Sequence, residues 1–255
     1  MHAITRSPTT YARTVLAVAI AGAIAWNIPY AGDVSLDYIA PRAVNLGILF
    51  SITIGFLMYK SLTRRSAMDD YIALELNKVR RMYHLAVHIA KTEPKATAWL
   101  AAIRGGIHEY LGLFRTMTFH EYDLGNPLFR HITYAIYSLP RQVPDYNKSL
   151  YDSLLATTAD VTLARENIRA KKDDQISMFS WMVVVLIALA FSVIVIAATP
   201  PEPVLRSVGG LVAFCLFLVL QLIYEHDRDN HRRDRSWAER YAADLVSLER
   251  ADRMQ

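Results

Sequence analysis

Four long blocks of apolar residues constrain this chain more than any other feature of its sequence. They cover residues 11–30, 43–62, 177–198 and 204–224. Each block is close to the roughly 20 residues that an α-helix needs to cross about 30 Å of hydrocarbon. Hydrophobic residues make up 53% of the chain, and a soluble domain would spread them at helical or strand period instead of collecting them in blocks. The sequence therefore predicts an all-α integral membrane protein with four transmembrane helices.

The first block needs a separate argument, because Arg6 and Arg13 precede it as basic residues precede the apolar core of a secretory signal peptide. Its apolar run is longer than a usual signal core. Trp26 and Tyr30 also lie at its far end, where aromatic residues anchor a span at the membrane interface. We therefore predict that this block is a transmembrane helix.

Positive charge is unequally divided between the two sides of these blocks. The cations on one side are Arg6, Arg13, Lys60, Arg64, Arg65, Arg169, Lys171, Lys172, Arg228, Arg232 and Arg233. The loops on the other side carry only Arg42 and Arg206. Loops rich in Lys and Arg stay in the cytoplasm, so we expect a multi-pass protein of the inner or plasma membrane with both termini cytoplasmic. The net charge of +4 then reflects topology, and we expect no nucleic-acid partner.

This topology divides the chain into five parts. Residues 1–10 form a cytoplasmic N-terminus, 11–62 a transmembrane hairpin, 63–176 a helical cytoplasmic domain, 177–224 a second hairpin and 225–255 a charged cytoplasmic tail. Apolar residues at steps of three and four predict that the second span continues as one helix to about residue 91, before Pro94. Further helices are predicted at 96–119 and 128–139, and from 145 up to the third span.

The tail keeps apolar residues at helical spacing among charges of both signs. These residues are Trp237, Tyr241, Leu245 and Leu248. The spacing predicts a helix that docks on another part of the protein, and the alternative is a solvated tail.

Residues that could carry catalysis are sparse. His84 and His88 lie four apart, which puts both imidazoles on one helical face at a spacing that can hold a transition metal. The other histidines are isolated, and the single cysteine, Cys215, lies inside the fourth span. No phosphate-binding glycine loop or nucleophile elbow is present. We therefore expect no enzyme and no cofactor, and the histidine pair supports only a minor metal-site hypothesis.

The second span has two distinct faces. One face carries small residues every four positions, Gly47, Ser51 and Gly55, which favour close helix packing. The rotated face carries an apolar column of Ile48, Ile52, Phe56 and Tyr59. Asn45 lies near the outer end of this column, and Lys60, Arg64 and Arg65 follow its inner end. If copies of this helix surround an axis, the column becomes a hydrophobic constriction with a cationic mouth. The alternative is ordinary packing within a four-helix bundle.

The order of elements resembles the bestrophin-like four-span family, in which two spans, a helical cytoplasmic block, two more spans and a charged tail follow one another. Locally, LTRRSAMDDYIALELNKVRRMYHLA, with Glu75 ahead of Arg80 and Arg81, is similar to the stretch after that family's second helix. ARENIRAKK, with Arg165 and Arg169, resembles its approach to the third.

Bestrophins are pentameric anion channels in which the second span lines the pore through a neck of stacked apolar residues. The resemblance implies that role for Ile48, Ile52 and Phe56. The acidic residues of EHDRDNHRRDRS are interleaved with arginines, so the resemblance does not extend to an acidic calcium-binding run.

Three functional hypotheses follow. The leading one is an oligomeric ion channel, a homopentamer by analogy, that prefers anions such as chloride and is surrounded by membrane lipid. The second is a non-conducting membrane scaffold that binds a cytoplasmic partner. The third is a metal-dependent membrane enzyme centred on His84 and His88.

Overall fold

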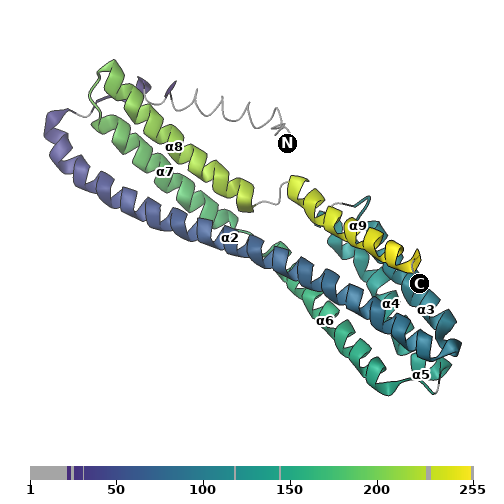
Figure 1. Cartoon of the computed structure of the whole chain (residues 1–255). Coiled ribbons are helices and arrows are strands. Elements are labelled where there is room, and N and C mark those ends of the chain that lie inside the picture. The colour runs from purple at the N-terminus through teal and green to yellow at the C-terminus, as the bar shows by residue number, and fades with distance from the viewer. Residues whose placement is uncertain are drawn as a thin grey trace. The chain divides into compact units, whose positions relative to one another are not determined.

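The structure, a computed structural model, describes residues 22–23, 26–30, 32–117, 119–143, 145–227 and 231–253. Within these ranges every regular element is a helix and there is no strand (Figure 1). Three of the described helical stretches are long and apolar enough to cross a membrane: Pro41–Thr92, Lys148–Ala198 and Pro203–Asp227. The predicted first span, at residues 11–30, lies mostly outside the described residues. The all-α fold is confirmed, and the number of spans stays a prediction.

Helix α2 comprises Asp33–Thr92 without a break. The predicted continuation of the second span to about residue 91 is therefore confirmed, and Pro94 opens the short 3-10 helix η1, Pro94–Ala96. The beginning differs from the prediction, because residues 33–42 were expected in a loop and instead form the first turns of α2, with Pro41 inside the helix. A proline removes one backbone hydrogen bond and bends a helix, but the turns on both sides can still form.

The chain divides into two compact units. Unit 1 consists of Met1–Thr63 and Gln175–Arg228, and unit 2 consists of Arg64–Asp174 and Asp229–Gln255.

Unit 1 contains the first part of α2 together with α7, Met178–Ala198, and α8, Pro203–Asp227, which lie side by side (Figure 1). Its small core consists of Phe50, Leu57, Ile176, Trp181, Val184, Ala188 and Ile223. Ser177 caps α7, because its side chain accepts a hydrogen bond from the Ser180 amide at 3.1 Å. The carboxylate of Asp227 is buried and accepts the Ile176 amide at 3.1 and 3.2 Å. Polar side chains thus satisfy the backbone where α7 begins and α8 ends.

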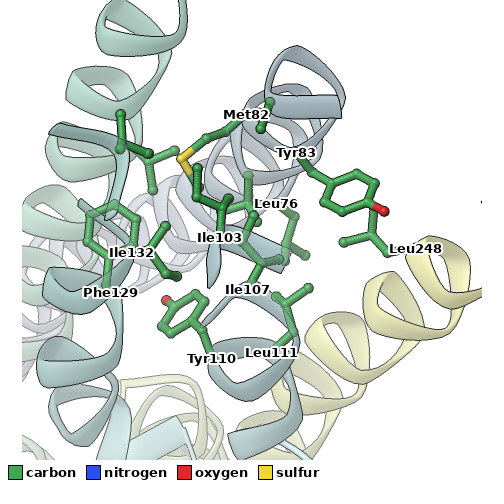
Figure 2. Packing of buried hydrophobic residues seen from close by; sticks show 14 of the residues in the cluster. Leu76, Met82, Tyr83, Ile103, Ile107, Tyr110, Leu111, Phe129, Ile132 and Leu248 are labelled. Atoms are coloured by element: carbon green, nitrogen blue, oxygen red, sulfur yellow. The ribbon is translucent and has the colours of Figure 1, made fainter. Parts of the chain in front are cut away.

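Unit 2 contains the second part of α2 and most of the shorter helices. These are α3, Thr97–Leu113; η2, Phe119–Gly125; α4, Asn126–Tyr137; α5, Leu139–Gln142; α6, Lys148–Asp173; and α9, His231–Arg253. Figure 2 shows side chains from four of them converging in one core: Leu76 and Met82 from α2, Ile107 from α3, Phe129 from α4 and Leu248 from α9. This core buries aromatic side chains as large as Trp99 and Tyr110.

One predicted helix boundary in unit 2 is wrong. The helix expected at 96–119 ends at Leu113, and Phe114 and Phe119 both turn inward against Tyr241, with ring centroids 4.0 and 6.4 Å away. Residues five apart on a straight helix point in different directions, so the chain leaves the helix to bury both rings. The helix expected from about residue 145 up to the third span is present as α6, which begins at Lys148 with Asn147 as its cap and ends at Asp173, shortly before α7.

The tail helix α9 packs on unit 2. Its buried apolar residues are Trp237, Ala238, Tyr241, Leu245 and Leu248. Trp237 also donates its indole N–H to Asp69 of α2 at 3.0 Å. The predicted docking of the tail is confirmed.

Candidate functional site

The predicted apolar column of α2 lies on the surface of unit 1. Ile48, Ile52, Phe56 and Tyr59 are 54%, 66%, 64% and 69% exposed. Their neighbours Phe50 and Leu57, on the other side of the same helix, are 6% and 3% exposed. The helical repeat explains the difference, because residues three and four apart share a face. The greater part of each of these four large apolar side chains is therefore left exposed in one copy of the chain.

The small residues of α2 have three different surroundings. Gly47 faces α7, where a Cβ atom would lie 3.2 Å from the ring of Phe191. The hydroxyl of Ser51 donates to the Gly47 carbonyl at 2.8 Å, and Gly55 has no atom within 4 Å of the position of a Cβ. Gly47 therefore permits a close helix contact inside unit 1, whereas Gly55 leaves a shallow notch on the surface.

The polar residues predicted at the two ends of the column also differ. Asn45 and Arg65 are exposed, and Lys60 is half-buried. Arg64 is buried, with Nε donating to the Lys171 carbonyl at 2.7 Å and Nη2 to the Lys172 carbonyl at 2.9 Å. Arg64 thus satisfies carbonyl groups at the end of α6, which are left without helical partners.

A buried charge cluster in unit 2 is the most highly connected polar group of the described residues. We define the Glu75 cluster as Glu75, Tyr110, Tyr122, Asn126, Arg165 and Tyr241, which come from α2, α3, η2, α4, α6 and α9. Glu75 is 0% exposed.

Four donors surround the Glu75 carboxylate. Oε2 accepts the hydroxyls of Tyr122 at 2.7 Å and Tyr241 at 2.6 Å. Oε1 accepts the Tyr110 hydroxyl and Nη1 of Arg165, the latter at 3.2 Å. With two donors on each oxygen, the acceptor capacity of the carboxylate is largely used. A buried charge that is paired and hydrogen-bonded in this way avoids most of the cost of leaving water.

Arg165 completes the cluster from α6. Its Nη1 also donates to the Tyr110 hydroxyl, and its Nη2 donates to Asn126 Oδ1 at 2.7 Å. The guanidinium carbon lies 4.8, 5.1 and 4.7 Å from the ring centroids of Tyr110, Tyr122 and Phe129, distances at which cation–π attraction contributes. The positive charge is therefore held by a carboxylate and by three aromatic faces.

The environment of the cluster keeps the tyrosines protonated. Burial, and next the negative charge of Glu75, raise the pKa of Tyr110, Tyr122 and Tyr241 well above the ordinary value. A protonated hydroxyl is the form that can donate to the carboxylate. The arrangement therefore connects six elements through one carboxylate, and its tyrosines are not poised for proton transfer at neutral pH.

In the sequence, Glu75 and Arg165 were noted only as parts of the family resemblance, and no role was predicted for either residue. The three tyrosines were not selected at all as polar partners. A charged residue inside an apolar helical stripe was the available signal, since Glu75 falls between Ile72 and Val79, which are both fully buried.

His84 and His88 are both exposed on α2. Among the described residues no group of three or more His, Cys, Asp or Glu side chains could hold a metal ion. The pair can therefore offer two ligands from one helix, and a tightly held metal usually takes more.

One comparison with known proteins shows a family. The family model described as Bestrophin-like domain matches residues 15–229 of this chain. No curated protein matches the sequence.

Solved structures of a bacterial bestrophin homologue from Klebsiella pneumoniae share the fold. A point variant is 14% identical, with a TM-score of 0.65 over 94% of this chain and 98% of that chain. The structure phased with zinc is also 14% identical, with a TM-score of 0.66 over 94% and 98%. A second variant is 11% identical, with a TM-score of 0.67 over 92% and 98%. At these identities the likeness establishes the fold alone.

Proposed function

Because this chain belongs to the bestrophin-like family, whose bestrophin members are anion channels, we propose that it is an oligomeric ion channel whose pore is lined by α2. The observation that carries the proposal is the exposed column of Ile48, Ile52, Phe56 and Tyr59. In an assembly with α2 nearest the axis, these side chains would form a hydrophobic neck that gates by dewetting.

Anion preference rests on charge. Residues 43–62 contain no acidic side chain, and Lys60, Arg64 and Arg65 follow the apolar column. Arg64 donates to carbonyl groups at the end of α6, whereas Arg65 is exposed. We propose that Arg65, together with Lys60 at the end of the column, attracts chloride. Asn45 marks the opposite, outer mouth. Cationic side chains at a pore mouth raise the local concentration of anions.

The assembly that we propose is a closed homopentamer in the inner or plasma membrane, since closed symmetry is the rule for homo-oligomers. Each copy crosses the membrane four times, with residues 11–62 and 177–224 as hairpins. Residues 1–10, 63–176 and 225–255 are then cytoplasmic, in keeping with the positive-inside rule. Close helix packing in this assembly uses the small-residue face of α2, which carries Gly47, Ser51 and Gly55. Within one copy, Gly47 already packs against Phe191 of α7.

The direct test is electrical. We expect purified protein in planar bilayers to show a reversal potential that follows the chloride gradient, with little change when sodium is replaced by a larger cation. Mass photometry in nanodiscs should show one closed species near five copies. A reversal potential that follows the cation gradient would overturn the anion preference. Absence of current from a well-formed oligomer would overturn the channel proposal.

A further inference from the structure

An open groove lies between α2 and α9 of unit 2. Its volume is about 460 Å³, which is within the range of small-molecule sites. Ala73, Asn77 and Arg80 line the groove from α2, and Arg240 and Asp244 are among the residues that line it from α9. We call it the α2–α9 groove. Its residues have no part in the proposed pore, so the groove is a separate candidate site.

One carboxylate that lines the groove is incompletely hydrogen-bonded. Asp244 is 6% exposed. Its Oδ1 accepts Nη2 of Arg80, whereas its Oδ2 has no hydrogen-bond partner within the described part of the chain. A buried acceptor without a donor is costly, and more so when the acceptor belongs to a charged group. The groove therefore contains an acceptor for which a bound molecule can supply the missing donor.

The two arginines of the groove keep unused donors. A guanidinium has five N–H donors. Arg80 uses Nη2 for Asp244, and Nη2 of Arg240 lies 2.9 Å from Asp69 Oδ1. Donors therefore remain on both walls of the groove. A carboxylate is the group that best uses them, because its two oxygens match the fork of a guanidinium.

The walls of the groove are fixed by contacts behind it. Tyr241 of α9 donates its hydroxyl to Glu75 of α2 at 2.6 Å, and Trp237 donates its indole N–H to Asp69 at 3.0 Å. Leu76, which also lines the groove, belongs to the core. A site whose residues are already held in place loses little entropy when it binds a ligand.

We propose that the α2–α9 groove binds a small carboxylate that carries an ammonium or hydroxyl group next to its carboxyl group. The carboxylate pairs with Arg80 and Arg240, and the ammonium or hydroxyl donates to Asp244. A plain carboxylate leaves Asp244 without its donor, and a plain amine meets two arginines. The small side chain of Ala73 leaves room for a short hydrocarbon part. The inference is independent of ion conduction.

The test uses four small probes that differ only in these groups: lactate, alanine, propionate and ethylamine. Their binding to the full-length protein in detergent is measured by isothermal titration calorimetry. We expect lactate or alanine to bind at least about tenfold more tightly than propionate and ethylamine, because a hydrogen bond to a charged group accounts for about that factor. The tighter of lactate and alanine identifies the donor as hydroxyl or ammonium.

Two variants connect the binding to the groove. Asp244→Asn keeps the shape of the side chain and removes the charge that the donor meets, so we expect it to weaken the better ligand about tenfold and to leave propionate unchanged. Ala73→Leu fills the groove from an exposed position of α2 and should weaken binding by about tenfold or more. Ala101→Leu, at an exposed position of α3 outside the groove, is the matched control and should change binding less than about twofold.

Three results overturn the proposal. In the first, neither lactate nor alanine binds, as when a second copy of the chain covers the groove. In the second, propionate or ethylamine binds as tightly as the better of the two. In the third, Ala73→Leu binds that ligand as well as Ala101→Leu does. Ala73 is exposed, so this third comparison remains decisive if Asp244→Asn fails to assemble in gel filtration.

Discussion

The two units of this protein differ in the side chains that break the usual rule of apolar inside and charged outside. In unit 1, Ile52 and Phe56 are 66% and 64% exposed, although they are among the most apolar residues of the chain. In unit 2, Glu75 and Arg165 are 0% and 4% exposed, although they are charged. The exposed apolar surface of unit 1 is suited to contact with hydrocarbon or with a partner helix, whereas unit 2 turns its large apolar side chains inward.

Polar groups are also used differently in the two units. Two buried polar side chains of unit 1 lie near helix ends: Arg206 donates to the Ile28 carbonyl at 2.5 Å, and Asp227 accepts the Ile176 amide. Those of unit 2 include a cluster at the centre of the packing, which joins α9 to α2 through Tyr241 and Glu75. Unit 1 therefore satisfies its backbone with polar residues, and unit 2 also uses them to fix the arrangement of its helices.

The largest expected effect is loss of the Glu75 charge. Glu75→Gln leaves the Arg165 cation buried without its carboxylate, and breaking such a pair typically costs about 3–5 kcal/mol. The free energy of unfolding is measured by chemical unfolding in detergent, followed by tryptophan fluorescence. Glu166→Gln, at an exposed position on the same helix as Arg165, is the control and should change stability by less than about 0.5 kcal/mol. Equal effects of the two variants would contradict the proposed importance of the cluster.

The next prediction compares neighbouring positions in unit 1. Leu57 is 3% exposed and Phe56 is 64% exposed. Leu57→Ala should destabilise the protein by about 2–5 kcal/mol. Phe56→Ser should leave assembly intact and raise conductance, because a small polar residue admits water to a hydrophobic neck.

For Leu57→Ala and Phe56→Ser alike, the measurements are the yield of assembled oligomer and the current across a bilayer. Loss of assembly without added current in Phe56→Ser would show that this face packs against other helices.

The third prediction concerns pH. Burial and Glu75 raise the pKa of Tyr110, Tyr122 and Tyr241 above the value of an unfolded chain. The stabilisation is therefore fully present below the unfolded pKa of about 10 and is lost as pH rises toward the folded values. Each tyrosine should contribute a slope of about 1.4 kcal/mol per pH unit above pH 10.

The loss of stability is measured as the free energy of unfolding between about pH 9 and about pH 11.5, on either side of the unfolded pKa. Replacement of Tyr122 by Phe should reduce the slope by about one tyrosine's share. Lysines titrate in the same range, so the difference between wild type and variant is the quantity of interest. An unchanged slope in the variant would contradict the assignment.

The smallest expected effect comes from two helix caps, one in each unit. Asn147 accepts the Leu150 amide at 3.1 Å at the start of α6, and Ser177 accepts the Ser180 amide at 3.1 Å at the start of α7. Replacing either residue by alanine should cost about 1 kcal/mol, as measured by thermal unfolding. A much larger loss of stability for Ser177→Ala than for Asn147→Ala would show that water replaces the missing cap less well at the start of α7 than at the start of α6.

The sequence alone predicted the helical class, the continuous α2 and the docking of α9, because these depend on the length and period of apolar runs. It placed Ile48, Ile52 and Phe56 on one face of α2 for the same reason, and their role in a pore stays a prediction. The early end of α3 at Leu113 was missed, since only the packing of Phe114 and Phe119 on Tyr241 makes the chain turn there.

Only the tertiary structure decided which charges are buried and with whom. Glu75 and Tyr241 are 166 residues apart, and no spacing rule connects positions that far apart. Arg64 looked like part of a cationic mouth in the sequence, but in the structure it donates to the carbonyls of Lys171 and Lys172. Periodicity is a property of one helix and can be read from its residues, whereas the pairing of a buried charge depends on which helices meet around it.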